Sequence, residues 1–190
     1  MGLPALQIVL EDYVAAVIAS MERVRQLEEE IGKMLPGWRL GPVVKALQSM
    51  RGIGPVTAAT IVAETGDMNR FPSPRSYMAF IGIIPSEHST GDSIRRGKIT
   101  KTGNKHLRYA LTEAARQYCH KARVTRVILQ RQEGLPKDII DLAFKAQKRL
   151  CRRFSALVMR GKHRNKTAVA IARELAGFVW ALVRQVPIAA

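Results

Sequence analysis

Acidic side chains are scarce in the second half of this 190-residue chain. Residues 95–190 hold only 5 of the 15 Asp and Glu residues but 23 of the 31 Lys and Arg residues, so this half carries all of the net positive charge of +16. A surface so basic repels itself unless a polyanion is its usual neighbour. The charge distribution therefore indicates a nucleic-acid partner, and the alternative is a solvated basic surface that has no such partner.

Cysteines and long apolar runs are also scarce. Cys119 and Cys151 are the two cysteines, they lack CxxC spacing, and the four histidines are scattered. This pattern argues against a disulfide framework, and we predict no metal site in this chain. The longest apolar run, residues 77–85, is far shorter than a membrane span, and the N-terminus lacks the basic region of a signal peptide. We therefore expect a cytoplasmic protein that has no membrane partner.

Helical periodicity is what the chain has in abundance. Apolar residues recur at spacings of three and four over residues 4–34, which predicts a long, coiled-coil-like amphipathic helix within residues 1–36. Its apolar stripe packs either inside one domain or against a second helix, and we expect a homo-oligomer formed through it. Further helical patterns fill residues 42–186, which predicts a second, helical domain. Ser73 followed by Pro74 is expected to start one of its helices, and Gly103-Asn104 to cap another. The predicted fold class is all-α or mostly α.

Residues 43–66, VVKALQSMRGIGPVTAATIVAETG, have the pattern of a helix-hairpin-helix. In this interpretation Gly52 and Gly54 let the backbone approach a phosphate closely, while Ile53 fills the gap between the two helices. Amides at the start of the second helix, with Thr57 in its first turn, would then bind one DNA strand without reading its bases. The alternative is a structural pair of helices that does not touch DNA.

A hydroxyl-rich segment, residues 82–103, leads into basic helices over residues 104–186. Residues 95–131 hold 11 basic side chains and 1 acidic one, and residues 137–166 hold 10 basic and 2 acidic ones. Such density favours contacts with phosphates over base reading, and it predicts binding that weakens steeply with salt. RNA is an alternative ligand for one of these helices.

The stretch FIGIIPSEHSTGDSIRRGKITKTGNKHLRYALTEAA resembles the C-terminal transposase domain of the DEDD-type insertion-sequence transposases, the insertion sequence 110/116/902 family that includes the Piv-like recombinases. The family pattern has a glycine and a proline, a serine next to a glycine, and a basic Gly-Asn motif that ends in Leu-Arg. In this chain these are Gly82 and Pro85, Ser89-Thr90-Gly91, and Lys101-Thr-Gly103-Asn104-Lys-His-Leu107-Arg108. With the helix-hairpin-helix and the N-terminal helix, the resemblance covers nearly the whole chain.

The resemblance implies strand exchange between DNA duplexes, guided in this family by an element-encoded RNA. Strand cleavage is attributed to a serine of this domain, together with a RuvC-like acidic domain whose carboxylates bind a divalent metal such as Mg²⁺. We expect that domain, and the metal, outside these 190 residues, and we expect no cleavage without it. Ser89 and Thr90 are both candidates for the nucleophile, because the residue directly before the glycine is Thr90.

The remaining site residues follow from the same resemblance and from their charge. Arg95, Arg96 and Arg108 would offset the negative charge of the phosphoryl transition state. The side chains predicted to contact nucleic acid are Lys98, Lys101, Asn104 and Lys105. Two alternatives remain: a nucleic-acid-binding helix-hairpin-helix protein without chemistry, and an inactive remnant of a transposase. In either of these, the two hydroxyls would serve only in a turn or a helix cap.

Overall fold

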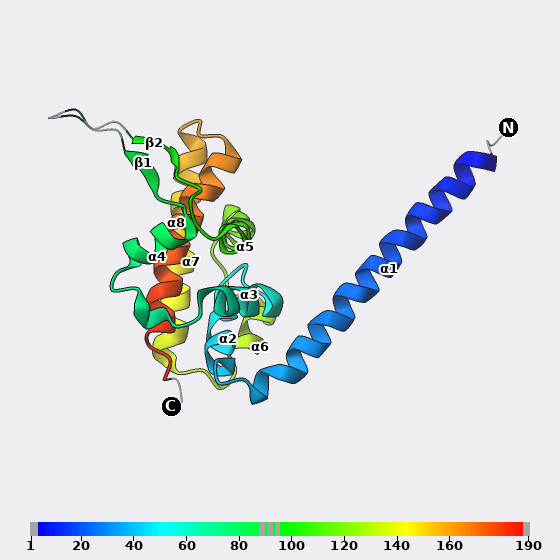
Figure 1. Cartoon of the computed structure of the whole chain (residues 1–190), viewed down its shortest axis with the longest axis horizontal. Coiled ribbons are helices and arrows are strands. Elements are labelled where there is room, and N and C mark those ends of the chain that lie inside the picture. The colour runs from blue at the N-terminus through cyan, green and yellow to red at the C-terminus, as the bar shows by residue number, and fades with distance from the viewer. Residues whose placement is uncertain (1–3, 88–89, 91–92, 94–95, 188–190) are drawn as a thin grey trace. The chain divides into compact units, whose positions relative to one another are not determined.

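The computed structural model describes residues 4–87, 90, 93 and 96–187 (Figure 1). In this part of the chain the secondary structure comprises eight α-helices, three short 3-10 turns and one two-stranded sheet, which confirms the mostly α fold with its long N-terminal helix. Contacts divide the chain into two units, Met1–Trp38 and Arg39–Ala190.

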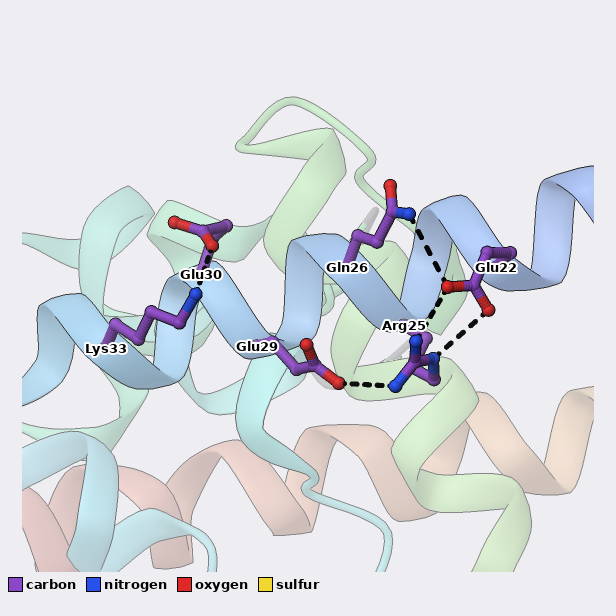
Figure 2. Close-up of polar contacts among 6 residues, drawn as sticks. All are labelled: Glu22, Arg25, Gln26, Glu29, Glu30 and Lys33. Carbon is purple, nitrogen blue, oxygen red and sulfur yellow. Dashed lines mark hydrogen bonds and ion pairs between the residues drawn. The ribbon is translucent and has the colours of Figure 1, made fainter.

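The first unit is the single helix α1, Pro4–Met34, followed by a 3-10 turn at Leu35–Gly37. None of its residues is buried, and its apolar side chains are exposed along the whole helix. A lone helix in water needs support from its own side chains. Ion pairs along the helix give that support. Figure 2 shows Arg25 donating to Glu22 and to Glu29, each at 2.7 Å.

Five charged side chains of α1 form ion pairs within the helix. Lys33 pairs with Glu30 at 2.6 Å, one turn away (Figure 2). The hydrogen bond from Arg25 lowers the pKa of Glu22. Such pairs at spacings of three and four stabilise an exposed helix only weakly, because water and salt screen the charges. The apolar stripe remains without a partner inside this unit.

By length and composition alone, one helix in the described part of the chain, Pro4–Gly37, is apolar enough to cross a membrane. Core helices of soluble proteins and signal sequences share this length and composition. Glu11 and Asp12 interrupt the apolar residues of this segment, so the sequence did not indicate a membrane span here. The absence of a membrane partner stays a prediction.

The second unit is built around its last helix, α8, Arg164–Val183. Helices α2 (Gly41–Leu47), α4 (Pro74–Ile81), α5 (Lys105–Arg116) and α7 (Lys137–Met159) all pack against α8. Nine residues of α8 are buried, because small and branched apolar side chains occupy positions on more than one of its faces. They are Thr167, Ala168, Ile171, Ala172, Leu175, Ala176, Val179, Leu182 and Val183.

The other helices of this unit surround the same core. Helix α3, Pro55–Thr65, packs against α2 and α5, and α6, Arg126–Gln132, precedes α7. Local sequence signals fix the helix starts. Ser73 caps α4 in a reciprocal arrangement with Ser76, and Pro74 occupies its first turn, as the sequence predicted.

A short hairpin interrupts the helices. Strands β1, Pro85–Glu87, and β2, Arg96–Ile99, pair antiparallel with an irregular register, and they project from the helical unit in Figure 1. The sequence indicated a hydroxyl-rich turn at this place and gave no sign of strands. Strands of three and four residues are too short for the alternation of apolar and polar residues to be visible.

Candidate nucleic-acid interface and serine loop

The candidate nucleophiles lie on the loop that joins β1 to β2. Thr90 is exposed, and it exchanges two backbone hydrogen bonds with Ser93, from Thr90 N to Ser93 O at 3.2 Å and from Ser93 N to Thr90 O at 3.1 Å. Ser89 and Arg95 lie outside the described residues. Arg96 is the first residue of β2, and its side chain is not among the parts that the structure describes. The exposed hydroxyl of Thr90 is accessible to a large substrate such as a nucleic-acid backbone.

The base of this hairpin is held by two glycines in close contact. A Cβ atom added to Gly103 would lie 2.1 Å from the carbonyl oxygen of Phe80 and 2.6 Å from the amide nitrogen of Gly82. Gly82 itself has φ +75° and ends α4 in the left-handed conformation. The amide of Lys101 donates to the carbonyl of Gly82 at 3.0 Å, and the amide of Asn104 donates to the carbonyl of Phe80 at 3.0 Å. Any larger side chain at either glycine would separate these two backbone segments.

Asn104 and Arg108 tie the hairpin base to the helices. The side-chain oxygen of Asn104 caps α5 by accepting from the amides of His106 and Leu107, at 2.9 and 3.0 Å. Its Nδ2 donates to the carboxylate of Glu64 on α3 at 2.7 Å. Arg108 donates from Nη1 to the carbonyl of Ile81 at 2.8 Å. The sequence predicted the cap but not Glu64, which lies 40 residues away and belongs to no local motif.

The turn between α2 and α3 has one glycine packed and one glycine open. Gly52 has φ +80°, and a Cβ on it would lie 2.3 Å from the carbonyl oxygen of Ala114 on α5. Ile53 is fully buried, as its predicted role between the helices requires. Gly54 precedes α3 in an extended conformation, and the nearest atom to a Cβ there is Nη2 of Arg131, 3.8 Å away. Of the two glycines, Gly54 is therefore the one that leaves room for an approaching group.

Arg131, on α6, reaches this turn from a distant part of the sequence. Its Nη1 donates to the carbonyl of Ile53 at 3.4 Å. The first amides of α3 have no acceptor inside the helix, and no side chain caps this helix. Thr57, in the first turn of α3, is partly exposed. Free amides, a hydroxyl and a guanidinium thus meet at one helix start, which is an arrangement suited to a phosphate.

The predicted basic contacts lie on the hairpin and at the start of α5. Lys98 on β2, Lys101 after it and Lys105 at the first position of α5 are all exposed. Lys101 has φ +58°, a left-handed conformation at a residue other than glycine. None of the three lysines forms an ion pair with the acidic residues that the structure describes. Their charges are available to a ligand.

Two buried tyrosines belong to the core of the second unit. Burial raises the pKa of Tyr77 to about 12, partly opposed by its 3.0 Å hydrogen bond with Thr65. Burial also raises the pKa of Tyr118 well above its ordinary value. Both hydroxyls are inaccessible to a polymer, so they are not candidates for attack on DNA.

Metal ligands do not gather in the described part of the chain, where no group of three or more His, Cys, Asp or Glu side chains could hold an ion. Glu64, which reaches the hairpin base through Asn104, already accepts a hydrogen bond from that side chain. The described residues therefore do not fit a metal centre.

Comparison with known proteins shows which protein family this chain is similar to. Residues 44–128 match the model described as the transposase IS116/IS110/IS902 family. The chain is 40% identical over 182 residues, 96% of its length, to the Sinorhizobium fredii protein named "Putative transposase y4qE". It is 27% identical over 180 residues to the transposase for insertion sequence element IS1111A of Coxiella burnetii, and 27% identical over 164 residues to that for IS1328 of Yersinia enterocolitica. The chain spans 42–43% of the length of these three relatives and 86–96% of its own length.

Proposed function

Because the chain belongs to the transposase IS116/IS110/IS902 family, we propose that it is the DNA-binding C-terminal part of an insertion-sequence transposase that cuts and exchanges DNA strands with a hydroxyl of the β1–β2 loop. The observation that carries the proposal is the 40% identity with a transposase-named relative along 96% of the chain. The exposed hydroxyl at Thr90, at the end of an anchored hairpin, supports the chemical role.

In this proposal, one DNA contact lies at the turn between α2 and α3. A phosphate would accept from the first amides of α3 near Gly54 and from the hydroxyl of Thr57, with Arg131 supplying a charge-assisted contact. Gly52 and Ile53 support this turn from the inside, since one packs on α5 and the other is buried. The contacts involve the backbone of DNA only, so target choice comes from elsewhere in the complex, and a guide RNA is the partner that the family resemblance implies.

Strand cleavage is a transesterification at phosphorus. The hydroxyl oxygen of Ser89 or Thr90 forms a bond to phosphorus, and the bond from phosphorus to the leaving sugar oxygen breaks. The hydroxyl proton goes to a base, and the leaving oxygen takes up a proton. The protein–DNA ester keeps the free energy of the broken phosphodiester bond for the later strand exchange, so no external energy source is needed. Lys98 and the guanidinium groups of Arg95 and Arg96 would offset charge on the phosphoryl group.

The functions of Arg108 and Asn104 are to position the hairpin. Both side chains bond to the backbone or to Glu64 at the hairpin base, as their distances indicate. Lys101 and Lys105 flank the same base and would contact DNA next to the cleaved bond. The family resemblance implies that cleavage also needs the carboxylates of a RuvC-like acidic domain, with its Mg²⁺, outside these 190 residues.

Self-association through α1 is part of the proposal. An alternating spacing of four and three residues, which a coiled coil needs, is occupied by apolar side chains except at Ser20. The apolar members are Leu6, Leu10, Tyr13, Val17, Val24 and Leu27, and all are exposed in the isolated unit. Two copies would place two β1–β2 loops in one complex, as an exchange between two duplexes requires. A protein that acts on the DNA of the cell works in the cytoplasm, so we expect this location.

The test is covalent trapping on DNA. The full chain is incubated with labelled element-end DNA, guide RNA and the acidic domain supplied separately, and then resolved on a denaturing gel. We expect a band that survives denaturation and that disappears in either Ser89→Ala or Thr90→Ala, which identifies the nucleophile. A Ser93→Ala variant is the matched control, because Ser93 faces Thr90 across the loop.

A trapped band that persists in both variants would refute the assigned hydroxyls. The second candidate function is DNA binding without chemistry, and the open, uncapped start of α3 beside Arg131 is the observation that favours it. That function is indicated if duplex DNA is bound in a salt-sensitive way while no covalent band forms under any condition.

A further inference from the structure

A row of arginines lines a groove on α7. In the sequence, this row is distant from the hairpin and from the α2–α3 turn. The groove is formed by residues on one face of this helix, since they recur at spacings of three and four. They are Arg149, Arg152, Arg153, Ala156, Leu157 and Arg160. From the first arginine to the last the row extends about 16 Å along the helix axis, at about 1.5 Å per residue.

One carboxylate on α8 orders two of these arginines. Glu174 accepts from Nε of Arg149 at 3.1 Å and also pairs with Arg153. Its side chain is only 17% exposed, whereas the two arginines are 61% and 47% exposed. Glu174 therefore lies beneath the guanidinium groups, and it restricts their motion while leaving their outer edges in solvent. A side chain that is already ordered loses less entropy when it binds a ligand.

The groove keeps most of its positive charge. Arg152 and Arg160 are exposed and form no ion pair with any acidic side chain in the described ranges. Glu174 neutralises one of four charges, so the row retains a net charge of about +3. A concentration of like charges in so short a row is unfavourable by itself, and an anionic polymer lying in the groove would remove the repulsion.

The basic row continues beyond the end of α7. Lys162, Arg164 and Lys166 are exposed on the turn into α8 and in its first residues. In Figure 1 this turn, drawn in orange, points toward the same end of the helical unit as the β1–β2 hairpin. A polymer that followed the groove would leave it at that end.

We propose that this α7 groove binds the phosphate backbone of duplex DNA. The apolar floor of Ala156 and Leu157 offers no group that reads a base edge, and none of the lining residues is aromatic. Surfaces for single-stranded nucleic acid use aromatic side chains on which bases stack, so a groove without them fits the regular phosphates of a duplex better. The planar guanidinium groups suit phosphate oxygens, to which they donate two hydrogen bonds at once.

This inference rests on the proposed DNA-binding role and extends it to a second surface. The test is the salt dependence of binding, measured by fluorescence anisotropy with the full chain and a labelled random-sequence DNA duplex. The double variant Arg152→Gln/Arg160→Gln removes the two groove charges that have no acidic partner. The matched control, Arg39→Gln/Arg75→Gln, removes two exposed charges outside the groove and outside the other basic segments. Each double variant lowers the net charge by the same amount.

The slope of log K against log salt is negative, and its magnitude should fall by about 1.8 when two phosphate contacts are lost, at about 0.9 per contact on duplex DNA. We expect this drop for the groove variant and an unchanged slope for the control. Equal drops in the two variants, or no drop in either, would overturn the groove, because the charge effect would then be diffuse or located elsewhere. A drop seen only with single-stranded DNA or with RNA would also overturn it, in favour of a different ligand. If the unmodified chain does not bind duplex DNA at all, the proposed DNA-binding function and the groove are both refuted, whereas duplex binding without a groove effect refutes the groove alone.

Discussion

Replacing Gly52 by alanine tests whether the α2–α3 turn is held by packing. Gly52 has φ +80°, and an added Cβ would lie 2.3 Å from the carbonyl oxygen and 3.0 Å from the carbonyl carbon of Ala114. These are backbone atoms of α5, so no flexible side chain can move aside. The left-handed conformation costs an L-residue about 1–2 kcal/mol, and forcing a methyl group into a filled site costs about 1–3 kcal/mol.

The unfolded chain also changes, and it partly offsets this cost. Alanine has fewer unfolded conformations than glycine, which favours the folded state by about 0.4–1 kcal/mol. The expected net loss in the free energy of unfolding of Gly52→Ala is therefore about 1–5 kcal/mol. For a domain of this size it corresponds to a fall in Tm of roughly 2–20 °C.

Gly54→Ala is the matched control, two residues away in the same turn. Gly54 has φ −87°, and an added Cβ would lie 3.8 Å from a flexible guanidinium group. Alanine is a poorer residue than glycine before a helix start, by a few tenths of a kcal/mol, but the unfolded-state term acts in the opposite direction. We expect its stability to stay within about 0.5 kcal/mol of the parent, the range of most surface substitutions.

The assay is urea unfolding followed by tryptophan fluorescence. Trp180 reports on the second unit, since it lies on α8 and donates to the carbonyl of Phe71 at 3.0 Å. A Trp38→Phe background removes the other tryptophan, at the end of the first unit. Packing does not hold this turn if the unfolding free energies of Gly52→Ala and Gly54→Ala agree within about 0.5 kcal/mol, a resolution typical of mutational comparisons.

Two further predictions concern the hairpin base and α1. Asn104→Ala removes the cap of α5 and leaves Glu64 without its donor, so we expect a loss of about 1–3 kcal/mol in urea unfolding, whereas Glu64→Gln keeps the cap and should cost less. Equal losses for the two variants would contradict the cap as the larger contribution. Val17→Asp/Val24→Asp places charges on the exposed apolar stripe of α1, and sedimentation should then show a monomer at concentrations where the parent self-associates. Ala15→Asp/Gln26→Asp, on the opposite face of the helix, should leave self-association intact, and a parent chain that is monomeric at all concentrations would exclude an oligomer formed through α1.

The sequence predicted the features that depend on neighbouring residues. The spacing of apolar positions over residues 4–34 predicted α1, and the short side chains of Ser73 and Asn104 predicted the starts of α4 and α5. Helix periodicity and capping involve residues three or four positions apart, so one sequence is enough to find them. The mostly α fold followed from these elements.

Contacts between distant segments could not be predicted in this way. Arg131 approaches Ile53 from 78 residues away, and Glu64 reaches Asn104 from 40 residues away. The contact between Gly52 and α5 is also invisible in the sequence, where this glycine fits a phosphate-binding turn equally well. Only packing separates a glycine that is needed for a close helix contact from one that is needed for a ligand.

Packing also explains the basic Gly-Asn motif, residues 101–108, which leads into α5. Its glycine is in close contact with Phe80 and Gly82, its asparagine caps α5, and its arginine, Arg108, donates to Ile81. All three therefore hold the end of α4 against the start of α5, and β1 and β2 extend from that junction with Thr90 in the loop between them. Substitution at these positions would displace the loop hydroxyl even if none of them touched DNA. A loss of cleavage in such variants shows a chemical role only where the stability of the second unit is unchanged.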